Sequence, residues 1–297
     1  MARFRPYVLP VAIILGLLLH RWCAMFSFLV PYIIFCILLL TFTAVDLRKL
    51  RLTWLDLWLM LFQIVVSIGC YLLIHCCFGN DIIAEGVLIG VLCPVASSVA
   101  VISCLLGANR ATVTTYTIVG NLMVAVVAPI VFTLIGHHPE MGLWKGFLLM
   151  FGKIGSTLAL PFFLALVLQL WWPKANAAIA RFNILGFYFW SLALLFTLGQ
   201  TIDYIFLHGK GNWYNISWLG GLSLLFCVVQ FSTGRLIGRR YGNRIGGGQL
   251  LGQKNTAMGI WMANTFLTPL AAVFLAFYSI YQNVFNAWHM AQVKKKK

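Results

Sequence analysis

The residues with the most suitable chemistry for a charged ligand lie in a short polar segment, "GQKNTAMG" at residues 252–259, between two apolar runs. Its lysine, Lys254, is followed by Asn255 and Thr256. A lysine in such surroundings costs about 2.5–3.5 kcal/mol to insert into a membrane, and such residues tend to face a cavity and to be functional. We predict that Lys254, Asn255 and Thr256 contact an anionic substrate. Alternatively, Lys254 only bonds to carbonyls at a helix break or reaches toward water.

A second polar interruption, "CPVASS" at residues 93–98, lies in another apolar run. Pro94 removes a backbone donor and clashes with the preceding turn, so it predicts a broken helix. At the first segment, Gly246, Gly247, Gly248 and Gly252 are expected to weaken the helix, because glycine has low helix propensity. Helix N-termini at such breaks favour an anion or a polar ligand, so Ser97 and Ser98 are predicted to contact the substrate too.

The composition places these segments in a membrane. Of the 297 residues, 62% are apolar and 9% are charged, whereas a soluble domain carries about a quarter charged residues. Apolar runs of roughly 17 to 25 residues predict an all-α polytopic membrane protein. We expect ten spans, at about 6–20, 26–43, 54–74, 83–106, 111–135, 145–171, 184–206, 214–236, 246–265 and 267–291.

The charges separate by side in this ten-span arrangement. Sixteen of the 21 lysines and arginines fall on one side: Arg3, Arg5, Arg48, Lys49, Arg51, Arg110, Lys174, Arg181, Arg235, Arg239, Arg240, Arg244 and Lys294 to Lys297. The other side receives Arg21, Lys145 and Lys210, with Asp81, Glu85, Glu140 and Asp203. Basic residues gather in cytoplasmic loops, so both termini are predicted to be cytoplasmic. Lys153 and Lys254 remain at membrane depth.

The two interruptions fall at corresponding places. One lies in the fourth span of the first five, and the other in the fourth span of the second five. Because five is odd, two such halves, 1–138 and 139–297, insert with opposite orientation. Interrupted helices at matching places in inverted halves are typical of the binding site of a secondary transporter. We expect the broken helices 4 and 9 to cross near the middle of the membrane.

Two segments resemble the bile acid:sodium symporter family. "CPVASSVAVISCLLGANRATVTTYTIVGNLMVAVVAPIVF" resembles the broken fourth span and the fifth span, and "GQKNTAMGIWMANTFLTPLAAVFLAFYSIYQNVFNAW" resembles the ninth and tenth. "LTFTAVDLRKLR" also resembles the loop after the second span. The resemblance implies a ten-helix inverted-repeat carrier in which a core of spans 3–5 and 8–10 moves against a panel of spans 1, 2, 6 and 7. It also implies that Gln282 and Asn283 line the substrate cavity.

The chain departs from this family at the sodium ligands. Val99 and Ala100 stand at a Ser-Asn pair, and Val113 stands at a hydroxyl position. Leu250 stands at a glutamate, and Lys254 at the crossover glutamine. Only Gln63 and Thr117 retain ion-coupling positions. The resemblance therefore implies that Lys254 replaces a sodium ion as a tethered cation, and desolvation of its ammonium could also couple transport to protons.

The predicted function is a secondary active transporter of a small or amphipathic organic anion, working by alternating access and not coupled to sodium. A sodium-dependent bile acid-type symporter with non-standard ligands, or an auxin- or arsenite-type carrier, is the alternative. An enzyme is not expected, because the chain shows no HExxH pattern or Ser/His arrangement and its acidic residues lie in loops or at span ends. A channel or sensor is disfavoured because polarity gathers at two breaks. Neither cofactor, metal nor nucleic acid is expected, and the bilayer is predicted to be a bacterial inner membrane.

Overall fold

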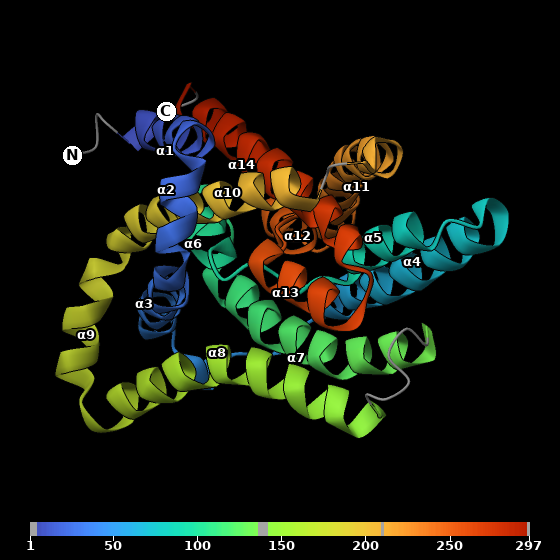
Figure 1. Ribbon diagram of the computed structural model, residues 1–297. Coiled ribbons are helices and arrows are strands. Elements are labelled where there is room, and N and C mark those ends of the chain that lie inside the picture. The colour runs from blue at the N-terminus through green and yellow to red at the C-terminus, as the bar shows by residue number, and fades with distance from the viewer. Residues whose placement is uncertain (1–4, 136–141, 209–210, 296–297) are drawn as a thin grey trace.

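The computed structural model describes residues 5–135, 142–208 and 211–295, and throughout these ranges the chain is helical with short turns (Figure 1). The helices are α1 (Arg5–Leu18), α2 (His20–Met25), α3 (Val30–Thr43), α4 (Trp54–Phe78), α5 (Asp81–Leu92), α6 (Val99–Leu105), α7 (Arg110–Ile135), α8 (Leu143–Trp171), α9 (Pro173–Arg181), α10 (Leu185–His208), α11 (Trp213–Arg240), α12 (Arg244–Gly252), α13 (Thr256–Phe266) and α14 (Ala272–Lys295). Within these ranges, 3₁₀ turns lie at Phe26–Leu29, Leu47–Lys49, Phe182–Ile184 and Pro269–Ala271. The predicted boundary between the halves, and the charged residues Arg3, Glu140, Lys210, Lys296 and Lys297, lie outside the described ranges.

Six stretches of helix are long and apolar enough to cross a membrane, within the part of the chain that is described. They are Trp54–Phe78, Arg110–Ile135, Trp144–Trp171, Pro173–Gln200, Trp213–Arg240 and Pro269–Gln292. Large apolar side chains such as Leu160, Phe163, Leu225 and Val228 are exposed on these helices, and lipid covers such surfaces. The chain is therefore a helical polytopic membrane protein.

The number ten stays a prediction. Of the four other expected spans, the first two contain α1 and α3, which have 14 residues each. Expected spans 4 and 9 are each divided into two shorter helices, α5 and α6 in one and α12 and α13 in the other. Two helices lie between expected spans: α2, which has six residues, and α9. The α9 helix begins at Pro173, where the fixed φ of proline suits the first helical position. It carries Lys174 and Arg181 on a helix without buried residues.

The shorter helices pack against the long ones in two groups, one around α10 and the other around α11 and α14. The α3 helix packs on α8 and α10, and α1 and α2 pack on α10. The α5 helix packs on α4, α11 and α14, and α12 packs most extensively on α11. Figure 1 shows α12 and α13 in the middle of the molecule, with α3 and α9 on the left, α4 and α5 on the right, and α8 along the bottom of the view.

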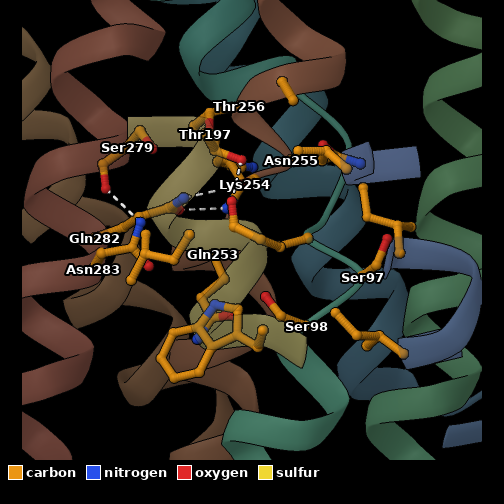
Figure 2. Close-up of a pocket in the computed structure, with 18 of the residues that line it drawn as sticks. Ser97, Ser98, Thr197, Gln253, Lys254, Asn255, Thr256, Ser279, Gln282 and Asn283 are labelled. Carbon is orange, nitrogen blue, oxygen red and sulfur yellow. Dashed lines mark hydrogen bonds between the residues drawn. The ribbon is translucent and has the colours of Figure 1, made fainter. Parts of the chain in front are cut away.

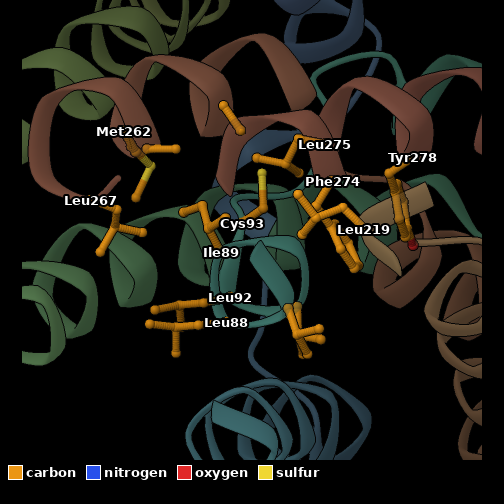
Figure 3. Packing of buried hydrophobic residues seen from close by; sticks show 14 of the residues in the cluster. Leu88, Ile89, Leu92, Cys93, Leu219, Met262, Leu267, Phe274, Leu275 and Tyr278 are labelled. Carbon is orange, nitrogen blue, oxygen red and sulfur yellow. The ribbon is translucent and has the colours of Figure 1, made fainter. Parts of the chain in front are cut away.

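The largest apolar cluster surrounds the carboxyl end of α5. Leu88, Leu92 and Cys93 are fully buried there, in one cluster with Met262 of α13 and Phe274 of α14 (Figure 3). Lipid is as apolar as these side chains, so van der Waals packing rather than removal from water holds the ends of the short helices there. These short helices are therefore held by packing against long neighbours.

Glycines allow α11 and α12 to approach at backbone contact. A Cβ atom added to Gly234 of α11 would lie 2.3 Å from the carbonyl oxygen of Gly247, and one added to Gly247 would lie 2.3 Å from the carbonyl oxygen of Gly234. Small residues allow such close packing of membrane helices. The glycine cluster thus lies within a regular helix, α12, and permits its close contact with α11, whereas the sequence led us to expect a weakened helix.

We expect Gly234→Ala to lower the stability of the folded protein by about 1–3 kcal/mol, because the atoms in the way are backbone and cannot rotate aside. The matched control is Gly221→Ala on the same helix, where an added Cβ meets nothing within 4 Å. Thermal unfolding in detergent measures both variants. Equal midpoints for the two variants would contradict the contact between α11 and α12.

Candidate functional site

The first interruption separates α5 from α6. The α5 helix ends at Leu92, and the amide of Cys93 makes its last helical bond, to the carbonyl of Ile89 at 2.9 Å. Pro94 follows and has no N–H to continue the ladder. Cys93 is extended, with ψ of 139°, as the residue before a proline prefers. The helix resumes at Val99.

The second interruption separates α12 from α13. Gly252 is the last residue of α12, and Gln253 is extended, with φ of −91° and ψ of 111°. A Cβ atom on Gly252 would lie 2.4 Å from the ring of Phe231, so close packing requires glycine there. Asn255 caps the next helix, because its side-chain oxygen accepts a hydrogen bond from the amide of Met258 at 3.2 Å.

The two interruptions cross and pair with each other. Val95 and Lys254 form an isolated antiparallel bridge. The amide of Ala96 donates to the carbonyl of Gln253 at 3.1 Å, and the amide of Asn255 donates to the carbonyl of Pro94 at 2.7 Å. Backbone groups that lost their helical partners are thus satisfied by the other interruption, as buried backbone requires.

Lys254 places its ammonium at the carboxyl end of α5. Its Nζ donates to the carbonyl of Val91 at 2.8 Å, and the side chain is 1% exposed. Gln63 of α4 donates from Nε2 to the next two carbonyls, those of Leu92 and Cys93, at 2.9 Å each. A helix C-terminus carries a partial negative charge, so a cation is favourable there. This is the carbonyl contact that the sequence analysis left open as an alternative.

The carboxyl end of α12 has its own donor. The hydroxyl of Tyr278 on α14 donates to the carbonyl of Gly252 at 2.8 Å and accepts from Nε2 of Gln230 at 3.2 Å. Both half-helices that end at the crossing are therefore capped by side chains from neighbouring helices.

Gln282 of α14 fixes the backbone of Lys254. Its Oε1 accepts from the amide of Lys254 at 2.8 Å, and its Nε2 donates to the carbonyl of Lys254 at 3.0 Å. Each buried peptide group of the lysine thus has a partner from α14.

A cavity lies between this crossing, α14 and the helices α3 and α10, with an empty volume of about 600 Å³ that includes space open to the exterior. All seven predicted substrate-binding residues line it: Ser97, Ser98, Lys254, Asn255, Thr256, Gln282 and Asn283 (Figure 2). The opposite wall is largely apolar and comes from α3 and α10: Val30, Ile34, Ile37, Trp190, Ala193, Leu194 and Thr197.

Two residues predicted to couple an ion lie elsewhere. Gln63 uses its amide on α5, and its Oε1 accepts from the hydroxyl of Tyr116 at 3.1 Å. Thr117 donates from Oγ1 into its own helix, to the carbonyl of Val113 at 2.8 Å. Neither residue lines the cavity.

Sequence reasoning missed half of a polar row on α14. Ser279 and Asn286 line the cavity together with Gln282 and Asn283. Their spacing of i, i+3, i+4 and i+7 puts all four on one helix face, so this periodicity in the sequence could have predicted that Ser279 and Asn286 face the same cavity. Gln253 of the second interruption also lines the cavity and was not predicted to do so.

Three buried polar atoms in the cavity wall have no hydrogen-bond partner among the described residues. They are Oγ of Ser279, Oδ1 of Asn286 and Oε1 of Gln253. Unpaired buried polar groups are costly and call for water or a ligand. Lys254 is the only charged residue among the described residues of this wall, and the amino end of α13, at Thr256 and Ala257, lies beside it.

The fold and the site together define a membrane protein built around two interrupted helices that cross beside a polar cavity. Residues 11–291 match the SBF-like CPA transporter family, so the chain belongs to this family, which is similar to the bile acid:sodium symporters. A search among curated proteins found no significant match. Membership identifies a membrane transporter, in agreement with the expectation that the chain is not an enzyme.

Proposed function

We propose that the protein is a secondary active transporter that moves a small or amphipathic organic anion by alternating access, without sodium, and with Lys254 as a fixed cation at the crossing. The observation that carries the proposal is the buried ammonium of Lys254 on the carbonyl of Val91, at the centre of the two interruptions. No carboxylate among the described residues forms an ion pair with it. A charge buried in a medium of low dielectric acts strongly on a nearby anion.

The polarity of the half-helices supports an anion. The two carboxyl ends at the crossing are occupied by Lys254, Gln63 and Tyr278. The amino end of α13 instead lines the cavity, and a helix amino end favours negative charge. The apolar wall from α3 and α10 suits a ligand with an apolar body.

Sodium independence is supported by what the side-chain oxygens near the crossing already do. Oε1 of Gln63 accepts from Tyr116, and the hydroxyl of Thr117 donates within its helix. The fully buried Leu250 supplies no carboxylate. The ammonium of Lys254, rather than a sodium ion, is thus proposed to satisfy the carbonyl of Val91 at the end of α5.

An inverted repeat is supported by the direction of the crossing. The interruptions of the two proposed halves, 1–138 and 139–297, pair antiparallel at Val95 and Lys254, as corresponding segments of inverted halves would. We propose that both termini face the cytoplasm of a bacterial inner membrane, and that spans 1, 2, 6 and 7 form the panel against which the core moves.

Uptake into proteoliposomes tests the proposal. Labelled organic anions are supplied with potassium replacing sodium on both sides, and each transported compound is repeated with sodium and with an imposed proton gradient. We expect uptake without sodium, together with counterflow against preloaded unlabelled anion, because a carrier exchanges bound substrate. Stimulation by the proton gradient would identify protons as the coupling ion.

A strict requirement for sodium would overturn the sodium-independent mechanism and favour a symporter with non-standard ligands. Uptake of arsenite or of auxin-like acids alone would favour the other carriers. Flux without counterflow would contradict a carrier and indicate a channel.

A further inference from the structure

A second cavity lies one helical turn further along the same two wall helices. It has an empty volume of about 470 Å³, including space open to the exterior. Leu40 and Thr41 of α3 line it three and four residues after Ile37, which lines the first cavity. Phe187 of α10 lines it three residues before Trp190, which lines the first cavity. The two cavities therefore follow one seam between the α3–α10 wall and the crossing.

Arg110 provides the charge in this second cavity. It is partly buried at the start of α7, and its Nε contacts Sγ of Cys104 at 3.2 Å. Among the described residues, no carboxylate lies within ion-pair distance of Arg110, and none lines the cavity. An arginine guanidinium carries five donors and is always charged, so this one retains donors for an anion.

The remaining wall suits an anion with an apolar part. Asn183 is partly exposed there, and its side-chain amide makes no hydrogen bond with the described residues. Val101, Leu105, Ile184 and Phe187 supply apolar surface beside it. Carboxylates and sulfonates on an apolar body match this combination of one fork of donors, one amide and an apolar wall.

Apolar side chains separate the two cavities. Ile37 and Phe187 are each 1% exposed and belong to one packed cluster with Ile102 and Trp190. The rings of Phe187 and Trp190 pack edge to face at 6.0 Å. A ligand can therefore occupy the second cavity without reaching the first.

We propose that the Arg110 cavity is a second binding site for amphipathic carboxylates or sulfonates, placed on the route to the crossing. Its use by the transported substrate rests on the proposed function, whereas its affinity for anions does not. The same chemistry could be supplied by a free anion or by the headgroup of an anionic lipid.

Cys104 makes the site measurable. Two methanethiosulfonate reagents would label this thiol in phosphatidylcholine vesicles: the anionic 2-sulfonatoethyl reagent and the cationic 2-(trimethylammonium)ethyl reagent. Peptide mass spectrometry measures the rate at which each reagent modifies Cys104. We expect Arg110→Gln to lower the ratio of anionic to cationic labelling rates by roughly fivefold, the upper range for a partly exposed ion pair. Arg110→Lys should retain the ratio. Any effect of Arg110 on the thiolate changes both rates equally, so the ratio reports charge attraction alone.

Protection gives the second measurement. Decanesulfonate should slow the cationic labelling of Cys104 in the native protein and in Arg110→Lys, but not in Arg110→Gln, whereas decyltrimethylammonium should protect none of them. Slower labelling in vesicles that contain phosphatidylglycerol, without added sulfonate, would identify lipid headgroups as occupants of the site.

A labelling ratio unchanged in Arg110→Gln, or protection that survives in it, would overturn the second site. Neither readout requires transport. Charge-selective labelling without anion uptake would thus preserve the site and reject the proposed function, and uptake without selective labelling would do the reverse.

Discussion

Lys254→Met is expected to reduce uptake by roughly 10- to 150-fold, the equivalent of about 1.5–3 kcal/mol for a hydrogen bond to a charged group. Methionine keeps the length and apolar stem of the lysine but cannot donate to the carbonyl of Val91. The carboxyl end of α5 then loses its cation in a place where water is excluded. Initial uptake rates in proteoliposomes measure the effect, and thermal unfolding shows how much of it reflects loss of the fold.

Lys153→Met is the matched control. Lys153 of α8 is the other lysine predicted to lie at membrane depth, but it is exposed, and its Nζ lies 5.2 Å from the ring centroid of Trp261. An exposed cation–π contact contributes about 0.5–1 kcal/mol, so this variant should transport within a few-fold of the native rate. Comparable losses in the two variants would indicate a general need for positive charge and reject a special role for Lys254.

The helices themselves could be predicted from the sequence because lipid requires long apolar runs. Expected spans such as 54–74 and 111–135 correspond to α4 and α7, with ends that differ by a few residues. The interruption at Pro94 was predicted because proline removes a helical bond inside a helix and the polar Ser97 and Ser98 follow it, whereas Pro129 and Pro161 lie within the continuous helices α7 and α8. Local chemistry decides both features.

The partners at the crossing could not be predicted, because they depend on how distant helices pack. Residues 254 and 91 are 163 positions apart, and nothing near Lys254 in the chain indicates that its ammonium lies on the carbonyl of Val91. Gln63 was predicted to bind an ion, yet its amide is directed to Leu92 and Cys93. Its role as an ion ligand stays a prediction.

The glycines of α12 show how one pattern permits two interpretations. Gly246, Gly247 and Gly248 suggested a weakened helix, but they form a regular one and permit contact with α11. A sequence alone does not show whether a neighbour approaches closely enough to compensate for low helix propensity.

Gln282→Leu is expected to be among the most destabilising substitutions in the site. It removes both partners of the Lys254 peptide groups, the acceptor at 2.8 Å and the donor at 3.0 Å. An unsatisfied buried polar group costs about 1–3 kcal/mol, so two of them cost roughly 2–6 kcal/mol. The ammonium of Lys254 would then no longer be held in place, and both the uptake rate and the midpoint of thermal unfolding should fall.

Asn283→Leu is the control on the adjacent residue. Asn283 lines the same cavity, but among the described residues its Nδ2 donates only to the carbonyl of Ser279 in its own helix, at 2.7 Å. Its replacement should change the unfolding midpoint little, while binding of the substrate weakens if Asn283 contacts it. Equal unfolding midpoints in the two variants would show that the clamp on Lys254 does not hold the crossing. A lower midpoint confined to Gln282→Leu would separate the residue that supports the site from the one that only faces the ligand.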